Sequence, residues 1–194
     1  MPTPIEQWDQ RYLAGEQVFR TPAPLVVEFT RGLTPGIALD LASGPGRNSL
    51  YLAARGWQVT AVDGSSIAID LLRRSNPSID AHLADLEADF AIDEFIMAPE
   101  TYDLILCCYY FQRSLIPRIK SALRPGGLLI MIVHVTSTDE PRETPRRACP
   151  GELRALFSDW TVLHYREGEP GESCHRHAVA ELVAKAHRTG RASI

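Results

Sequence analysis

The sequence has 194 residues, the length of one globular domain with a substantial core. Apolar residues make up 45% and charged residues 23%, which excludes a disordered or fibrous chain. The formal net charge of −4 argues against an electrostatic grip on nucleic acid or on anionic lipid. No apolar run reaches the roughly 18 residues that cross a membrane, and no leader pattern opens the chain. We therefore expect a cytoplasmic protein with a small-molecule partner.

In chain order, apolar periodicity predicts two helices, then strands alternating with helices, then a final strand. The expected helices are 5–14, 23–30, 48–55, 67–75, 115–123 and 153–157. The expected strands are 36–41, 58–62, 79–84, 102–108, 128–135 and 160–165. The Arg-Pro-Gly-Gly run at 124–127 should stop the preceding helix and turn the chain into the next strand. This alternation is typical of an α/β domain with a parallel sheet.

Two segments near the C-terminus differ from this pattern. Residues 136–147 are rich in Thr, Pro and charge and are expected to form a surface loop. Residues 174–186 have the composition of an Ala-rich helix, but a last strand pairing with 160–165 would complete the sheet. We expect one domain over 1–194, with a helical cap at 1–33, a core at 34–135 and a C-terminal part at 136–194.

The four cysteines do not suggest a disulfide framework. They lie at positions 107, 108, 149 and 174. Cys107 and Cys108 are adjacent in an apolar run and would point to opposite faces of a strand. In the same way Cys174 would point away from His175 and His177, so no metal site is predicted.

The most informative segment is 38–48, where an apolar strand enters a glycine turn that opens a helix. Asp40 precedes the turn, and Gly44 and Gly46 lie within it. Glycines let a ligand approach the backbone closely, and the helix N-terminus offers free amides to an anion. The turn indicates a nucleotide-like cofactor, with a ligand-free tight turn as the alternative.

Two further acids end the next two expected strands. Asp63 follows the turn by the interval at which a carboxylate accepts hydrogen bonds from ribose hydroxyls. Asp85 ends the third strand, and Leu86 beside it could pack on a flat base. In a doubly wound sheet the carboxyl ends of these strands open on one crevice, so three successive acids favour the cofactor.

This combination resembles the class I S-adenosylmethionine-dependent methyltransferases over 36–135. Their first motif is an acid followed by Gly-x-Gly-x-Gly, and here Ala42 replaces the first glycine, which tightens the turn. The resemblance implies a doubly wound, Rossmann-like, seven-stranded, mostly parallel sheet with an antiparallel last strand and helices on both faces. It also implies S-adenosyl-L-methionine as cofactor, with Asp40 facing its amino group through water, Asp63 on the ribose and Asp85 on the adenine amino group. The cofactor-binding residues implied in this way are Asp40, Ala42, Ser43, Gly44, Gly46, Arg47, Asn48, Asp63, Gly64, Ser65, Asp85, Leu86 and Cys107.

Shorter matches at 8–12, 44–49 and 110–115 resemble small bacterial methyltransferases of the tellurite-resistance type and relatives of thiopurine methyltransferase. The residues expected at the methyl acceptor are Trp8, Tyr12, Arg20, Tyr109, Tyr110 and Arg113. His134, after the fifth expected strand, is the expected catalytic residue because a histidine titrates near neutral pH. A purely structural, hydrogen-bonded histidine is the alternative. Residues 1–20 are expected to form a lid, with a permanently packed helix as the alternative.

The predicted function is methyl transfer to a small molecule. A non-catalytic S-adenosylmethionine-binding sensor or interaction module is the alternative. A nicotinamide-dependent oxidoreductase is disfavoured by Asp40 and by Ser49 in place of the third glycine. No Pro-Pro-aromatic motif follows the fourth strand, and the arginines at 142, 146 and 147 are diluted by Glu140 and Glu143, so nucleic acid is not expected. The acceptor atom, the need for a base and the oligomeric state stay open.

Overall fold

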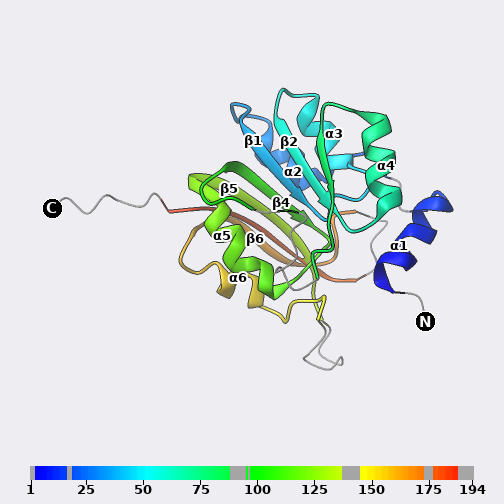
Figure 1. Ribbon diagram of the computed structural model, residues 1–194. Helices are drawn as coiled ribbons and strands as arrows, with labels where there is room; N and C mark the ends of the chain where they lie inside the picture. The colour runs from blue at the N-terminus through cyan, green and yellow to red at the C-terminus, as the bar shows by residue number, and fades with distance from the viewer. Residues whose placement is uncertain are drawn as a thin grey trace. The chain divides into compact units, whose positions relative to one another are not determined.

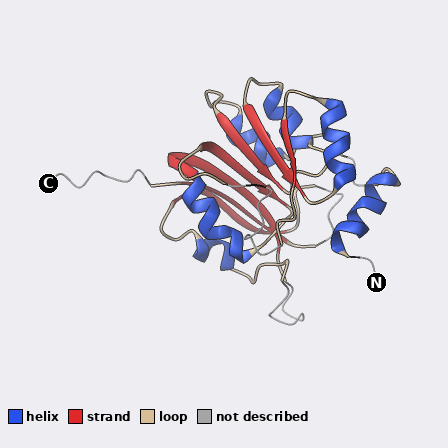
Figure 2. Cartoon of the chain, in the orientation of Figure 1, coloured by secondary structure: helices blue, strands red, loops and turns tan. Residues whose placement is uncertain are grey.

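The computed structural model describes residues 3–16, 19–87, 95, 97–136, 145–172 and 177–187. Two compact units divide the chain. The first unit comprises Met1–Ile96 with Leu106–Cys108, and the second comprises Met97–Ile105 with Tyr109–Ile194. Figure 1 labels the elements along the chain, and Figure 2 separates helices from strands.

The first unit is a parallel arrangement of strands and helices. Its elements are α1 (Pro4–Leu13), α2 (Pro24–Thr30), β1 (Ile37–Leu41), α3 (Arg47–Ala53), β2 (Gln58–Asp63), α4 (Ser66–Ser75) and β3 (Asp80–Leu83). β2 pairs in parallel with both β1 and β3, with Leu41 opposite Val62 and Asp63 opposite Leu83. This register brings the carboxyl ends of the three strands to one edge, where the acids predicted from the sequence lie.

The second unit is an antiparallel arrangement. Its elements are η1 (Arg113–Leu115), α5 (Ile116–Ala122), β5 (Leu123–His134), α6 (Glu152–Leu156), β6 (Thr161–Gly168) and β7 (Val179–Lys185). β7 pairs antiparallel with both β5 and β6. Five of its seven residues are buried, as expected of a strand with neighbours on both sides. The choice left open for 174–186 is therefore settled as a strand over 179–185, while Cys174 and His175 lie outside the described residues.

The strand β4 (Tyr102–Cys108) contributes residues to both units. The hydrogen-bonded strand order is β3-β2-β1-β4-β5-β7-β6. The predicted seven-stranded, mostly parallel sheet with an antiparallel last strand is confirmed. The predicted strand limits agree with the structure within a few residues, except at the start of β5.

The prediction that β5 starts at residue 128 was wrong. The helix α5 ends at Ala122, as the following Pro and Gly residues predict, but the chain is extended from Leu123 onward. The backbone N–H of Gly126 donates to the carbonyl of Ala186 at 3.1 Å, and the N–H of Ala186 donates to Gly127 at 3.0 Å. These two bonds pair the Arg-Pro-Gly-Gly run with the residue that follows β7. Gly126 has a positive φ of 82°, a conformation that glycine adopts without strain, so the run can make this pairing.

Most of the expected surface loop, from 137 to 144, lies outside the described residues. Val135 precedes this segment and Ala148 follows it, and these two residues form an isolated parallel bridge. None of the helices in the described ranges combines the length and the apolar character that a membrane span requires.

Candidate active site

Asp40 is a buried carboxylate at the end of β1. Its side chain accepts a hydrogen bond of 2.6 Å from the hydroxyl of Ser49, and only 1% of the residue is exposed. Burial raises the pKa of Asp40 to about 6, against the opposing effect of the Ser49 bond. The carboxylate is still largely ionised at neutral pH, so this edge of β1 presents a buried negative charge. Ser49 is a site residue that the sequence analysis missed.

Cys107, near the end of β4, lies in the same electrostatic environment. Burial raises the pKa of its thiol to about 12, and the charge of Asp40 adds to the effect. Cys107 is 1% exposed and its thiol stays neutral at pH 7, so it is not a nucleophile, and its place in the cofactor site stays a prediction.

The turn after β1 requires glycine at two positions for different reasons. A Cβ at Gly46 would lie 2.3 Å from Cδ1 of Leu72 on α4, and one at Gly44 would lie 3.0 Å from the hydroxyl oxygen of Tyr12. Gly44 and Gly46 both have positive φ values, 55° and 87°. Ala42 also lies in the left-handed region, with φ of 52°, which explains why glycine is usual there in the class it resembles.

Asp63 connects the turn after β1 to the turn after β2. One oxygen accepts a hydrogen bond of 2.7 Å from the N–H of Gly44, and the other accepts one of 2.8 Å from the N–H of Ser65. Burial raises the pKa of Asp63, while these two bonds oppose the rise. A carboxylate has about four acceptor positions, so Asp63 retains capacity for ribose hydroxyls.

The third acid lies beyond the end of β3. Asp85 is exposed, and its carboxylate accepts a hydrogen bond of 2.9 Å from the N–H of Glu87. Leu86 is 5% exposed, so nearly all of its surface is already covered by the protein. Asp85 is therefore available to a ligand, whereas Leu86 offers little area to a base.

Two of the expected cofactor residues on α3 make contacts within the protein. The side-chain oxygen of Asn48 accepts a hydrogen bond of 3.0 Å from the N–H of Ala23, and Asn48 is 4% exposed. This bond fixes the entry of α2, which has no side-chain cap of its own. The guanidinium of Arg47 lies 5.4 Å from the ring centre of Phe19.

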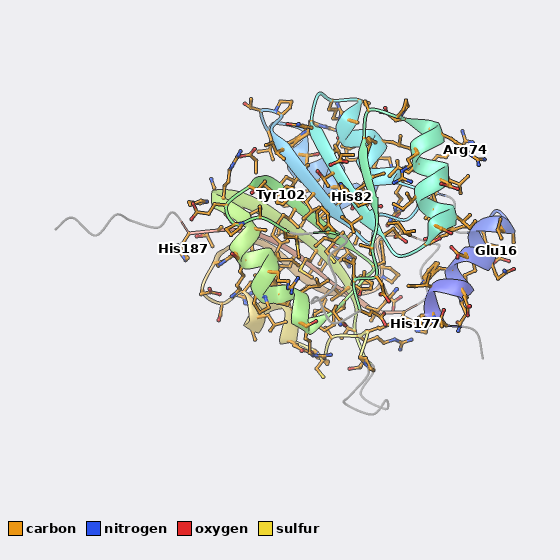
Figure 3. The ribbon with its side chains drawn as sticks, in the orientation of Figure 1. Glu16, Arg74, His82, Tyr102, His177 and His187 are labelled. Carbon is orange, nitrogen blue, oxygen red and sulfur yellow. The ribbon has the colours of Figure 1, made fainter. Side chains whose placement is uncertain are left out.

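α1 brings its side chains to the turns after β1 and β2. The rings of Trp8 and Tyr12 are stacked at 5.7 Å, as expected of residues on one face. Burial and the nearby charge of Asp63 raise the pKa of the Tyr12 phenol, which stays protonated. Arg20 is exposed. Figure 3 shows Glu16 just past the end of α1, and Arg74 on α4.

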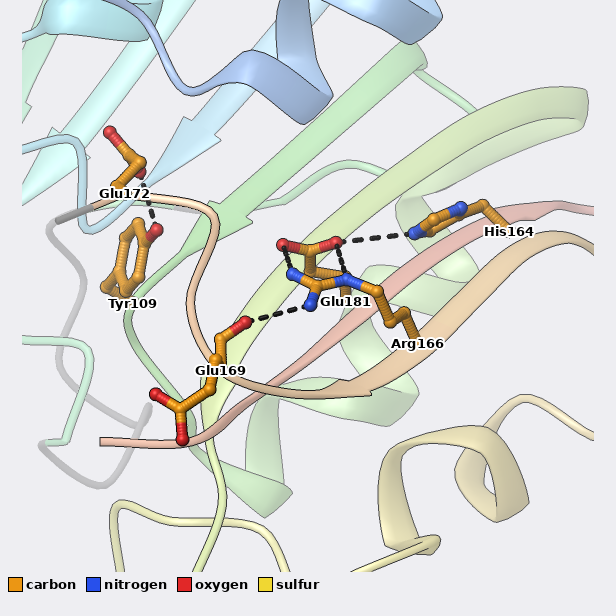
Figure 4. Close-up of polar contacts among 6 residues, drawn as sticks. All are labelled: Tyr109, His164, Arg166, Glu169, Glu172 and Glu181. Carbon is orange, nitrogen blue, oxygen red and sulfur yellow. Dashed lines mark hydrogen bonds and ion pairs between the residues drawn. The ribbon is translucent and has the colours of Figure 1, made fainter. Parts of the chain in front are cut away.

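The second unit contains its own polar cluster, which we call the Tyr109 cluster: Tyr109, His134, Glu172 and His177. The phenol of Tyr109 donates a hydrogen bond of 2.5 Å to the carboxylate of Glu172 (Figure 4). The ring of His134 lies 5.6 Å from that of Tyr109 and 5.9 Å from that of His177. Tyr109 has a φ of 64°, an uncommon conformation for an aromatic residue and one that is found at functional sites. Glu172 was not predicted from the sequence.

A second network holds the segment that carries Glu172. Arg166 on β6 donates two hydrogen bonds to Glu181 on β7, at 2.7 and 3.1 Å. Its third nitrogen donates to the carbonyl of Glu169 at 2.8 Å (Figure 4). The chain after β6 is therefore fixed at Glu169, three residues before Glu172.

Arg113, an expected acceptor residue, is engaged in a bidentate ion pair. Its Nε and Nη2 lie 2.6 and 2.8 Å from the two carboxylate oxygens of Glu152. Burial opposes the change, but the bonds from Arg113 and from the N–H of Cys149 lower the pKa of Glu152. Tyr110 is half-buried. Within the described residues, no group of three His, Cys, Asp or Glu side chains could hold a metal ion.

The strand order and the acids near the ends of β1, β2 and β3 agree with the arrangement expected for a class I S-adenosylmethionine-dependent methyltransferase. Residues 12–180 match the protein family described as tellurite resistance protein TehB. The chain therefore belongs to the TehB family. This assignment confirms the predicted class, that of the class I S-adenosylmethionine-dependent methyltransferases.

Individual relatives agree with this assignment. The chain is 29% identical over 155 residues to the probable S-adenosyl-L-methionine-dependent methyltransferase TehB of Haemophilus influenzae, covering 73% of this chain and 52% of that protein. The chain thus spans about half the length of this curated relative. The crystal structure of TehB from Haemophilus influenzae superimposes with a TM-score of 0.72 and 25% identity, covering 92% of this chain and 67% of that one. The trans-aconitate 2-methyltransferase of Paracidovorax citrulli is 30% identical over 136 residues, 61% of this chain and 49% of that protein.

Proposed function

We propose that the protein binds S-adenosylmethionine at the turns after β1, β2 and β3 and catalyses transfer of its methyl group to a small polar acceptor. The observation that carries this proposal is Asp63, whose carboxylate joins the two turns through the N–H groups of Gly44 and Ser65. Such a carboxylate pre-positions both turns around a ribose. Asp40 supplies a buried negative charge for the cationic amino group of the methionine portion.

When bound, the cofactor would supply an electrophilic methyl carbon on a sulfonium, and S-adenosylhomocysteine would be the leaving group when an acceptor attacks that carbon in line. The task of the protein is to align the acceptor and to exclude water. Asp40, Asp63 and the glycine turn would hold the cofactor. Tyr12 would cover the turn after β1, because its phenol lies against Gly44.

The Tyr109 cluster is the proposed acceptor site. Tyr109 directly follows β4 in the chain. The cluster offers two imidazoles, a phenol and a carboxylate, which can orient a polar acceptor and take up a proton. His134 keeps its proposed catalytic role on this basis.

The alternative is a protein that binds the cofactor without transferring its methyl group. The names of the relatives described above favour the enzyme, since the Haemophilus and the Paracidovorax proteins are both named as methyltransferases. The name of the family suggests tellurite as the first acceptor to test. The name of the Paracidovorax relative suggests trans-aconitate as a second.

The test is the release of S-adenosylhomocysteine from S-adenosylmethionine by the purified protein with tellurite or trans-aconitate. We expect acceptor-dependent release with one of them, and loss of cofactor binding in Asp63→Ala by about 2 to 3 kcal/mol, because charge-assisted hydrogen bonds disappear. Tight cofactor binding without release, across both acceptors and a wider set of thiols, amines and carboxylic acids, would support the non-catalytic alternative. Failure to bind the cofactor would contradict both.

A further inference from the structure

One face of α1 contacts the cofactor turns at three points. The face consists of Ile5, Asp9 and Tyr12, which are half-buried, while no residue of α1 is fully buried. A Cβ at Gly64 would lie 3.1 Å from Ile5, and a Cβ at Gly44 would lie 3.0 Å from the Tyr12 hydroxyl oxygen. Since these residues recur at i, i+4 and i+7, they form one helical stripe.

The middle point of this stripe is polar. The hydroxyl of Ser65 donates a short hydrogen bond to the carboxylate of Asp9, and the N–H of Ile67 donates to the same oxygen at 3.5 Å. Ser65 is the N-cap of α4, and its hydroxyl oxygen accepts a hydrogen bond of 3.1 Å from the N–H of Ala68. The carboxylate of Asp9, on α1, therefore lies at the N-terminal end of α4, where the helix dipole favours a negative charge.

Ser65 also belongs to the cofactor site. Its N–H donates to Asp63, whose other oxygen accepts from Gly44. A single residue thus connects α1 to the carboxylate that joins the two turns. No residue of α1 is fully buried, and a hydrogen bond to a carboxylate is stronger than one between neutral groups, so the Asp9–Ser65 bond contributes directly to holding the helix in this place.

We propose that Asp9 is a positioning residue that holds α1 over the bound cofactor, and that breaking its bond to Ser65 is the step that admits and releases the cofactor. This inference rests on the proposed binding of S-adenosylmethionine at these turns. α1 lies beside α4 (Figure 1), so rotation of the short helix away from α4 would expose Gly44 and Gly64 together. Asp9 acts through Ser65 and α1 and does not itself contact the cofactor.

The test compares the dissociation rate of S-adenosylhomocysteine from the full chain, by stopped-flow displacement, in Asp9→Ala, Asp9→Asn and Asp70→Ala. Asp70 is an exposed acid on α4 and is the matched control. We expect Asp9→Ala to dissociate about tenfold faster, the effect of one charge-assisted hydrogen bond. Asp9→Asn, which keeps an acceptor oxygen, should restore part of the slow rate, and Asp70→Ala should match the wild type. In turnover, Asp9→Ala should raise KM for S-adenosylmethionine and leave kcat unchanged or higher.

Three outcomes separate the possibilities. Wild-type protein that does not bind S-adenosylhomocysteine overturns the proposed function. Binding by the wild type with equal dissociation rates in Asp9→Ala and Asp70→Ala overturns the positioning role. A lower midpoint of thermal unfolding in Asp9→Ala with an unchanged dissociation rate also overturns it, because the contact is then structural only. If Asp9→Ala does not fold, Asp9→Asn decides by the same comparison.

Discussion

Asp40 combines a cost in stability with a proposed role in binding. Its pKa in the folded protein is about 6, above the ordinary value of 3.8. Between these two pKa values the folded state keeps a proton that the unfolded state has released. The contribution of this proton to the stability of the folded state is therefore fully present below about pH 4 and is lost as the pH rises through 6. At neutral pH the protein therefore carries a buried charge that destabilises the folded state.

Asp40→Asn should accordingly stabilise the protein without cofactor at pH 7.5. The asparagine can still accept the hydroxyl bond from Ser49 but has no charge to desolvate. The rise in the pKa of Asp40 corresponds to roughly 1 to 3 kcal/mol in the free energy of unfolding at this pH. The gain in stability of Asp40→Asn should shrink toward pH 4. Urea unfolding at several pH values measures it. The same variant should bind S-adenosylmethionine more weakly, by calorimetry, and a gain in stability that does not vary with pH would contradict this account.

Gly46 tests a purely steric requirement. Gly46→Ala would place a Cβ 2.3 Å from Leu72 and force a side chain into the left-handed region. The two effects together should lower the free energy of unfolding by roughly 2 to 4 kcal/mol. Gly15→Ala is the matched control, because Gly15 has a φ of 74° and nothing within 4 Å of the added Cβ. Equal losses in the two variants would show that Leu72 moves aside at no cost.

At the scale of elements, we expect the contacts of α1 to contribute little to the stability of the rest of the first unit. No residue of the helix is buried, and the entry of α2 is fixed independently by the bond from Ala23 to Asn48. A chain beginning at Thr21 should therefore unfold cooperatively, with a midpoint a few degrees lower at most. It should lose cofactor affinity by tenfold or more, because Ile5, Asp9 and Tyr12 leave the cofactor turns.

Thermal unfolding and calorimetry with S-adenosylhomocysteine check both parts. Leu13→Ala is the control, since Leu13 lies on the exposed side of the same helix at 64% exposure. A truncated chain that does not fold would favour the permanently packed helix, and full activity would exclude a lid.

The elements that were predicted well are those that depend on local signals. β1, β2 and β4 are apolar runs bounded by acids or turns, and their limits agree within one residue. The start of β5 could not be read from 124–127, because the hydrogen bonds that extend the strand come from Ala186. β7 stayed ambiguous for a similar reason, since alanine favours helix and only pairing with β5 and β6 makes a strand.

The candidate site divides in the same way. Asp40, Asp63 and Asp85 lie at or near the ends of their strands as predicted, because strand ends can be read from spacing, while their role in binding stays a prediction. Ser49 and Asp9 were not predicted, because their partners lie 9 and 56 residues away and only folding brings them together. Asn48 was expected to contact the cofactor, yet its side-chain oxygen is bonded to Ala23, 25 residues earlier.

For the whole molecule, the two units differ in the chemistry they carry. All the proposed cofactor residues belong to the first unit, whereas Tyr109 and His134 belong to the second. Cofactor affinity and turnover should therefore respond to different substitutions. His134→Ala should lower kcat about a hundredfold, the lower range for loss of an acid–base group, and leave the affinity for S-adenosylmethionine within twofold of the wild type.

Steady-state kinetics with the identified acceptor, together with calorimetry, measure this separation. His164→Ala is the control for loss of a histidine elsewhere in the second unit, since His164 lies on β6 with its ring nitrogen 3.4 Å from the carboxylate of Glu181. Native turnover in His134→Ala would return His134 to a structural role.

The position of β7 between β5 and β6 also constrains the order in which the chain can fold during synthesis. β6 leaves the ribosome before β7, but the strand with which it pairs is β7. Until residue 185 has emerged, both β5 and β6 present an open edge, and such edges are prone to pair with other chains. The second unit can then be completed only after β7 has been translated, so a nascent chain arrested near residue 170 should depend on chaperones far more than one that extends beyond residue 185.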